Sequence, residues 1–263
     1  MKIAIIGTGN LGNSIANGIV NGNVKFQSLY LTKRKIAELS LWENTPKVHI
    51  TTSNVEAVKH SEIILLAVQP KQLNTVLNEI KTYLNPLKHT IISVITGRKI
   101  EEIEQIIGND IAVVRSMPNT AIAVSESMTC MCANKKGELK VGEATSIFNA
   151  LGKTLFIDEK LMQAATVICA SGIAFWMRLI RATTQGAVQL GFDAKEAQQL
   201  AMQTSLGAAS LLVKTGSHPE QEIDKVTTPS GCTISGLNEM EHQGLSAALI
   251  KGLVTSYHKI NQI

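Results

Sequence analysis

The stretch "KIAIIGTGNLGNSIANGIV" at residues 2–20 decides the fold. A short apolar run ends at a G-x-G-x-x-G pattern, and residues with helical spacing follow it. Between a strand and a helix this pattern is typical of a dinucleotide-binding turn. Gly7 allows the tight turn, Gly9 lets a pyrophosphate approach the backbone, and Gly12 lets the helix pack against the strand. The helix N-terminus adds free N–H groups and a partial positive charge. The sequence therefore predicts a cofactor site in this loop, formed by Gly7, Thr8, Gly9, Asn10, Leu11 and Gly12.

Further along the chain, short apolar runs alternate with amphipathic segments. The predicted strands cover residues 2–6, 28–31, 47–50, 62–68, 90–95 and 111–117. Strands that are apolar throughout and alternate with helices indicate a parallel sheet covered on both faces. From residue 158 the pattern is helical, with the clearest helices at 173–190, 194–213 and 243–260. We therefore predict an α/β protein: a Rossmann-type doubly wound parallel sheet at 1–157, followed by an all-helical domain at 158–263.

Composition narrows the class of protein. With 44% apolar and 17% charged residues, the 263-residue chain is expected to be globular rather than disordered. A scattered net charge of +4 gives no reason to expect nucleic acid as a partner. The four cysteines form no CxxC pair, and no histidine cluster has metal-ligand spacing, so we expect reduced thiols, no metal and a cytoplasmic location.

No membrane segment is predicted. The N-terminal apolar run is too short for a signal peptide. The longest uncharged stretch, 161–177, is shorter than a typical membrane span and contains polar residues. We interpret it as a buried helix of a soluble protein.

The end of the second predicted strand indicates which dinucleotide binds. NAD-binding proteins place an acidic residue there to hold the ribose 2′-hydroxyl. This chain has Thr32, Lys33 and Arg34, with no acid before Glu38. A cationic side chain at this place can pair with a 2′-phosphate, which a carboxylate would repel. The sequence therefore favours NADP(H) over NAD(H).

The residues supply little acid–base chemistry. The histidines stand alone in the sequence, and no nucleophile elbow or His–Asp spacing is present. A ketone reduction would need a proton donor near the developing alkoxide. A protonated imine is already electrophilic, so its reduction by hydride depends mainly on positioning. We therefore expect a small-molecule substrate with a C=N bond.

Five motifs carry a family resemblance. They are the GTGNLG loop, "TTSN" at 51–54, "LAVQP" at 66–70, "RSMPNT" at 115–120 and "VTTPSGCTISGLNEME" at 226–241. In content, order and spacing the chain resembles pyrroline-5-carboxylate reductases over essentially its whole length. These enzymes use NAD(P)H in the last step of proline synthesis.

The resemblance implies roles for further residues. Asn54 would lie near the adenosine ribose, and Ala67, Val68, Gln69 and Pro70 beside the nicotinamide end of the cofactor. Backbone N–H groups of the C-terminal loop would bind the substrate carboxylate, and Thr233, the candidate catalytic residue, would hydrogen-bond near the ring nitrogen. The predicted substrate-binding residues are Ser230, Gly231, Cys232, Thr233, Asn119 and Ser171. The C-terminal helices would form a homodimer, and a larger assembly of dimers is left open.

The chain also departs from the family pattern around the substrate. Ser230 replaces a glycine, Cys232 a threonine and Cys169 a serine, while Ile173 replaces a proline and Gln69 a lysine. Ser230 would be restricted if its position requires a positive φ. These departures leave two alternatives open: a related reductase acting on another imino or keto acid, and an NADP(H)-binding protein without catalysis.

Overall fold

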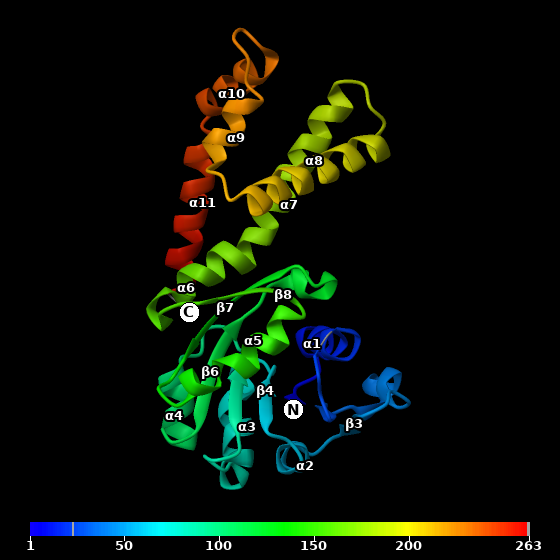
Figure 1. Ribbon diagram of the computed structural model, residues 1–263, viewed down its shortest axis with the longest axis vertical. Coiled ribbons are helices and arrows are strands. Elements are labelled where there is room, and N and C mark those ends of the chain that lie inside the picture. Colours follow the sequence, from blue (N-terminus) through cyan, green and yellow to red (C-terminus); the bar gives the residue numbers. More distant parts are fainter. Residues whose placement is uncertain (23, 262–263) are drawn as a thin grey trace. The chain divides into compact units, whose positions relative to one another are not determined.

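Figure 1 shows the computed structural model, which describes residues 1–22 and 24–261. The chain divides into two compact units, one formed by Met1–Ala170 together with Ile260 and Asn261 and the other by Ser171–Lys259. The first unit contains both strands and helices. In the second unit, all the regular secondary structure that the structure describes is helical. The predicted fold class, a Rossmann-type sheet followed by a helical region, is confirmed.

One eight-stranded sheet forms the centre of the first unit. Its strand order is β3-β2-β1-β4-β5-β6-β7-β8. Strands β1 to β6 run parallel, β7 is antiparallel to β6, and β8 is parallel to β7. The strands are β1 (Lys2–Ile6), β2 (Ser28–Thr32), β3 (Val48–Thr51), β4 (Ile63–Leu66), β5 (Thr90–Ser93), β6 (Ala112–Met117), β7 (Ser127–Ala133) and β8 (Gly152–Phe156).

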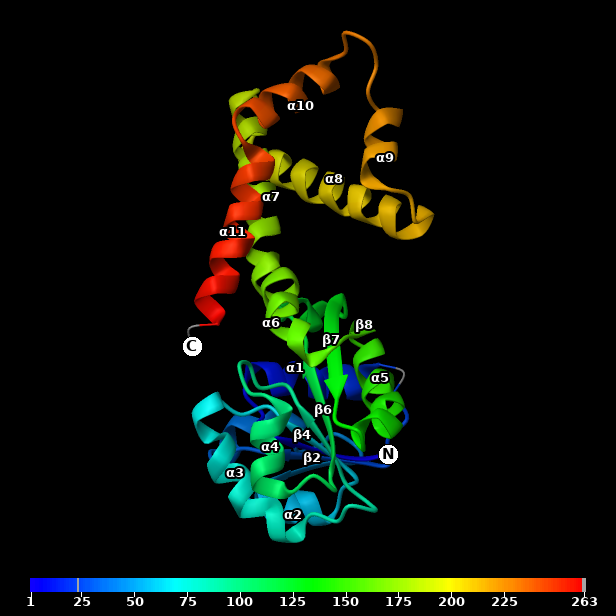
Figure 2. The same cartoon turned by 90° about the vertical axis from the view of Figure 1, so that its left-hand side faces the viewer.

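Helices cover both faces of this sheet, as its apolar strands require. Alternate residues of β1 point to opposite faces, so Ile3 and Ile5 join one buried core while Ala4 and Ile6 join the other. Helices α1 and α5 pack on the first core and α2, α3, α4 and α6 on the second; α3 and α4 lie side by side in Figure 2. These helices are α1 (Asn10–Asn21), α2 (Asn54–Lys59), α3 (Leu73–Ile80), α4 (Ile100–Ile107), α5 (Val141–Asn149) and α6 (Met162–Ala165).

Short turns complete the unit. Six are 3₁₀ turns: η1 (Ile36–Trp42), η2 (Pro70–Gln72), η3 (Lys81–Tyr83), η4 (Thr120–Val124), η5 (Gly137–Lys140) and η6 (Glu159–Leu161). A π-helical segment, η7 (Thr166–Ser171), follows α6. Such wide turns are rare and often mark functional places.

Two strands of the sheet were not predicted. Strand β7 has the sequence SMTCMCA and β8 the sequence GKTLF, neither of which is a continuous aliphatic run. Strand β8 is an edge strand whose Leu155 and Phe156 are about half exposed. Its burial pattern is therefore unlike that of the central parallel strands, which is why apolar continuity did not find it.

The second unit consists of helices with few buried side chains. They are α7 (Gly172–Gln189), α8 (Ala194–Thr215), α9 (Pro219–Lys225), α10 (Cys232–His242) and α11 (Leu245–Ile260). Among the described residues, every buried hydrophobic side chain except Ala197 and Ala201 belongs to the first unit. By contrast, Trp176 and Met177 of α7 are 64% and 62% exposed.

The expectation of a buried helix at 161–177 is therefore wrong for the single chain. Within the continuous helical stretch Glu159–Gln189, an 18-residue window has a mean hydropathy of 1.4, and only 17% of that window is buried. By length and composition alone this stretch could cross a membrane. Composition identified an apolar helix correctly, but it does not specify which molecule covers that helix.

A buried histidine next to β5 leads to a prediction about pH. The Nδ1 atom of His89 accepts a hydrogen bond from the Asn85 N–H at 2.9 Å. Burial, and then the nearby Lys88 cation, lower the pKa of His89 below its usual 6.5. Below that pH the unfolded chain binds a proton that the folded chain resists, so stability falls as the pH falls. We expect the melting temperature of His89→Gln to drop less between pH 7 and pH 5 than that of the unchanged protein. Equal drops would contradict this assignment.

Candidate active site

The glycine-rich loop between β1 and α1 has the geometry of a tight, closely packed turn. Gly7 has a φ of 94°, and a Cβ there would lie 2.6 Å from the Val68 side chain and 2.9 Å from the Ala67 carbonyl. A Cβ on Gly12 would collide with the carbonyl oxygen of Gly7. Gly7 therefore makes the turn, and Gly12 allows helix α1 to pack against it, as predicted.

The middle of this loop is open and suited to an anion. A Cβ on Gly9, the N-cap residue of α1, would meet no atom of the described residues within 4 Å. No side chain among the described residues caps this helix, so its first N–H groups remain free for an anion. The Thr8 hydroxyl is buried without a hydrogen-bond partner in the part of the chain that the structure describes. An open approach, free N–H groups and an unpaired hydroxyl fit the diphosphate of a dinucleotide.

A hydrogen-bond chain links this loop to the end of β2. The Thr32 hydroxyl accepts a bond from the Gly7 N–H at 3.3 Å and donates one to Asn54 Oδ1 at 2.7 Å. The Asn54 amide in turn donates to Glu79 Oε2 at 2.9 Å. The structure thus brings together Thr32 and Asn54, two residues predicted to bind the cofactor. It also adds Glu79, which no sequence motif indicated.

The two predicted cations after β2 have different partners. Lys33 forms an ion pair with Glu38 at 2.7 Å, and this lysine lowers the pKa of the Glu38 carboxyl. Arg34 is exposed and forms no ion pair with any residue in 1–22 or 24–261. Arg34 is therefore the better placed of the two to bind a 2′-phosphate.

The predicted nicotinamide-side residues follow β4, the strand beside β1. The Ala67 N–H donates to the Ile6 carbonyl at 2.9 Å, and the Val68 side chain packs over Gly7. Gln69 and Pro70 then begin η2, with the Gln69 N–H donating to Gln72 Oε1 at 3.1 Å. These residues therefore lie next to the glycine-rich loop at the carboxyl edge of the sheet, where α/β proteins bind ligands.

Asn119, a predicted substrate residue, also has a structural role. It is 7% exposed. Its Oδ1 accepts a bond from the Ala121 N–H at 3.0 Å, and its Nδ2 donates to the Cys169 carbonyl at 3.1 Å. The side chain therefore connects the RSMPNT motif to η7, the segment that ends at Ser171. One amide hydrogen remains for a ligand.

Sequence analysis missed Arg115, the first residue of the same motif. Its side chain is 3% exposed, and Nη1 donates to Glu159 Oε1 at 3.1 Å. The same carboxylate oxygen accepts the Ile100 N–H at 2.9 Å. Nη2 is buried without a partner among the described residues. The signal for this residue was an arginine inside an otherwise apolar strand.

The second loop, at 227–236, leads into α10. The Gly231 N–H donates to the Thr228 carbonyl at 3.0 Å, and Gly231 is the N-cap of the helix. A Cβ on Gly231 would collide with the Thr228 hydroxyl. In the part of the chain that the structure describes, no side chain caps α10, so the N–H groups at Cys232 and Thr233 remain available to an anion.

Ser230 holds a left-handed backbone conformation with a φ of 59°. The restriction foreseen for this position is therefore real, and the serine carries a strain that a glycine would not. This loop belongs to the second unit, whereas the glycine-rich loop belongs to the first.

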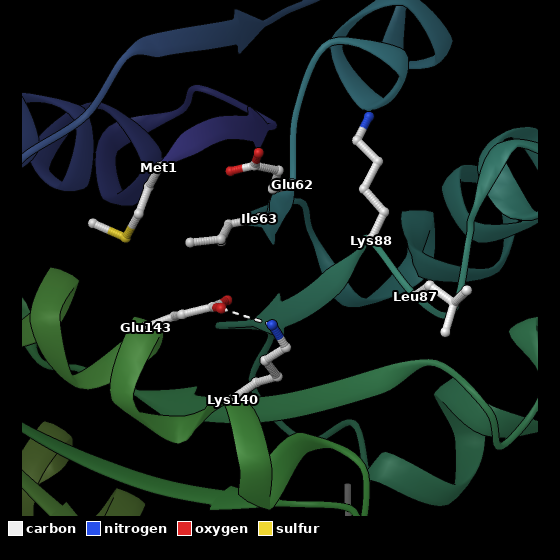
Figure 3. A pocket seen from close by; sticks show the side chains of 7 residues that line it. All are labelled: Met1, Glu62, Ile63, Leu87, Lys88, Lys140 and Glu143. Atoms are coloured by element: carbon white, nitrogen blue, oxygen red, sulfur yellow. Dashed lines mark hydrogen bonds and ion pairs between the residues drawn. The ribbon is translucent and has the colours of Figure 1, made fainter.

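A pocket elsewhere on the sheet does not have these features (Figure 3). It lies at the amino ends of β1, β4 and β5, on the edge opposite the glycine-rich loop. Its charged groups already have protein partners: Lys140 pairs with Glu143 at 3.0 Å, and Glu62 accepts the Lys2 N–H at 3.1 Å. We therefore assign it no part in the candidate site. Within 1–22 and 24–261, no group of three His, Cys, Asp or Glu residues is placed to hold a metal ion.

Comparison with known proteins identifies the family. A family model described as pyrroline-5-carboxylate reductase dimerisation matches residues 159–263, and one described as NADP oxidoreductase, coenzyme F420-dependent, matches 2–97. Pyrroline-5-carboxylate reductases 1 and 2 of Dictyostelium discoideum are 44% and 42% identical, each over 98% of this chain. The chain spans 49% of the length of the first relative and 91% of the second. The chain belongs to the pyrroline-5-carboxylate reductase family.

Solved structures of the family agree with this assignment. A pyrroline-5-carboxylate reductase from Coxiella burnetii has a TM-score of 0.94 and 28% identity, covering 99% of this chain and 97% of the other. The Plasmodium falciparum pyrroline carboxylate reductase, solved with NADP bound, has a TM-score of 0.85 and 28% identity, with the same coverage. The predicted family is confirmed, and the match to an NADP oxidoreductase model agrees with the predicted class of nicotinamide-dependent oxidoreductase.

Proposed function

We propose that this member of the pyrroline-5-carboxylate reductase family reduces 1-pyrroline-5-carboxylate to L-proline with NADPH. The observation that carries the proposal is a pair of helix N-termini without side-chain caps. Helix α1 begins at the open Gly9, and α10 begins at Gly231 after a strained loop. One suits the diphosphate of a dinucleotide, and the other suits the carboxylate of the substrate. Hydride transfer requires the anionic cofactor and the anionic substrate to be bound at the same time, and each of the two helix N-termini can hold one of them.

The residues of the chain bind and orient the reactants. Gly9 and the first turn of α1 hold the diphosphate. The hydrogen bonds of Thr32 to Gly7 and Asn54 hold the glycine-rich loop in place beside the adenosine ribose. When bound, NADPH supplies the hydride that reduces the C=N carbon. Within the predicted loop 230–233, the N–H groups of Cys232 and Thr233 hold the carboxylate, since the Gly231 N–H already donates to the Thr228 carbonyl. The Thr233 hydroxyl hydrogen-bonds near the ring nitrogen, which enters protonated or takes its proton from water.

We also propose domain boundaries and an oligomeric state for this chain. Residues 1–157 form the dinucleotide-binding domain, and 158–263 form the substrate-binding and dimerisation domain of a homodimer. The exposed apolar side chains of α7 support the dimer, since a helix of this composition needs a covering surface. Whether dimers join into larger assemblies, and the cytoplasmic location, remain predictions from sequence.

The direct test measures loss of NADPH absorbance with purified protein and 1-pyrroline-5-carboxylate, with proline as the product identified by chromatography. No consumption of NADPH between pH 6 and pH 9 would overturn the proposal. The strain at Ser230 motivates one competing function, reduction of a different cyclic imine. A panel of cyclic imino acids with other ring sizes separates the two, because the true substrate has the highest kcat/KM.

Arg34 is predicted to select the cofactor. We expect Arg34→Ala to raise the KM for NADPH by about tenfold, as loss of a charge-assisted hydrogen bond would, and to change the KM for NADH little. Lys33→Ala is the matched control, because Lys33 is already paired with Glu38 and its loss should have a smaller effect. Steady-state kinetics with both cofactors test this. Equal increases for NADPH and NADH would show that Arg34 does not contact the 2′-phosphate.

A further inference from the structure

Two cysteines of the first unit lie in contact next to the RSMPNT motif. The sulfur atoms of Cys130 and Cys169 are 3.9 Å apart, and both thiols are free. Cys130 is buried in β7, and Cys169 is partly exposed in η7. They are separated by 39 residues in the sequence and belong to the same compact unit. The contact is thus made by the fold rather than by adjacency in the chain.

The pair adjoins the RSMPNT motif on two sides. In the sheet, Cys130 of β7 is the register partner of Met117 in β6. The carbonyl of Cys169 accepts the Asn119 amide at 3.1 Å. A change in the position of Cys169 would therefore be transmitted directly to Asn119, one of the predicted substrate residues.

The two sulfur atoms are unequal in reactivity. Cys169 is partly exposed whereas Cys130 and Cys132 are buried, so a peroxide reaches Cys169 more easily. Either sulfur of the pair can donate to the other, and the hydrogen bond from Cys130 lowers the pKa of Cys169. The same hydrogen bond, together with burial, raises the pKa of Cys130. Cys132 lies two residues further along β7, where burial and Glu159 raise its pKa to about 12. Since the thiolate is the reactive form, Cys169 is the thiol of the three that is most prone to oxidation.

We propose that Cys130 and Cys169 are a redox-sensitive site, which a hydroperoxide converts to a reversible disulfide. The Cys169 thiolate attacks the peroxide oxygen, giving a sulfenic acid and releasing water or an alcohol. The Cys130 sulfur then displaces the hydroxyl group of the sulfenic acid, forming the S–S bond and a second molecule of water. Two thiols are oxidised, and one hydroperoxide is reduced. A dithiol reductant reverses the change by thiol–disulfide exchange.

The bond would distort the candidate site. A disulfide has an S–S distance of about 2.05 Å, so the two sulfur atoms must close roughly 1.9 Å. Cys130 is fixed within the sheet, so most of the movement falls on η7. The Cys169 carbonyl then moves away from the Asn119 amide that now donates to it. This consequence for activity rests on the proposed function, whereas formation of the disulfide does not.

The experiment treats the whole 263-residue chain with a small excess of hydrogen peroxide and then blocks the remaining thiols by alkylation. Peptide mapping should find Cys130 joined to Cys169. The rate of NADPH oxidation with 1-pyrroline-5-carboxylate should fall about tenfold or more, as expected for a misplaced substrate contact, and recover with dithiothreitol. Absence of the cross-linked peptide would overturn the proposal.

The matched variant is Cys169→Ser, which keeps the other three cysteines, including the exposed Cys232. We expect it to retain its rate after peroxide; an equal loss of rate would assign the inhibition to another residue and overturn the regulatory role. Cys130→Ser is a second variant. It cannot form the disulfide with Cys169, so we expect no cross-linked peptide and no loss of rate caused by that bond. A protein that forms the cross-link but never reduces the substrate would support the thiol site and contradict the proposed function alone.

Discussion

Gly9→Val is expected to weaken NADPH binding about a hundredfold while leaving the fold intact. A Cβ at this position would meet no described atom within 4 Å, and the φ of −82° suits an ordinary residue. The free protein therefore accommodates the side chain. The same space is where the diphosphate must approach the first N–H groups of α1, so the added methyl groups exclude it. We expect the Kd for NADPH to rise by about a hundredfold, roughly 2.7 kcal/mol of binding free energy.

Titration calorimetry and thermal melting together test this prediction. Gly142→Val is the matched control, because it also lies in open space but on α5, away from the loop. Both variants should melt near the temperature of the unchanged protein, and the control should bind NADPH normally. Normal binding by Gly9→Val would mean that the diphosphate does not approach this loop.

The second large effect is expected from Trp176→Glu. Trp176 lies on α7 and is 64% exposed in the single chain. If α7 is covered by a second copy, the variant places a carboxylate inside an apolar interface, which costs several kcal/mol. We expect the dimer to dissociate at micromolar protein concentration and the reductase rate to fall with it. Sedimentation equilibrium measures the first effect and NADPH consumption the second.

Leu87→Glu provides the control for this variant. Leu87 is 95% exposed and lies in the first unit, on the loop before β5. The same change of charge there should leave the assembly and the rate unaltered. A dimeric Trp176→Glu protein with normal activity would show that α7 does not lie in the interface.

The central fold could be read from the sequence because the parallel strands are buried on both faces. Ile63 to Leu66 and Thr90 to Ser93 are buried at every position, and such runs are conspicuous. Strand β8 lacks that signal, since an edge strand needs only one covered face. The burial of a helix is harder still to predict, because an apolar stripe looks the same whether its own chain or another molecule covers it.

The glycine-rich loop was predictable in detail because each glycine has one steric reason. Gly7, Gly9 and Gly12 differ in what a Cβ would meet, and the motif encodes that difference. Asn119 and Arg115 were less predictable, since their partners Cys169 and Glu159 lie more than 40 residues away. Contacts of this kind depend on the three-dimensional fold and leave no periodic pattern in the sequence.

The uneven distribution of buried side chains has a consequence for biosynthesis. Nearly all of the hydrophobic core lies in Met1–Ala170, the part of the chain that leaves the ribosome first. That part can complete its core during translation. The helices that follow bury little within their own unit, so in the proposed homodimer they reach their final stability only after meeting a second chain. In that dimer, folding of the first unit is set by the chain alone, whereas maturation of the second depends on the concentration of other copies.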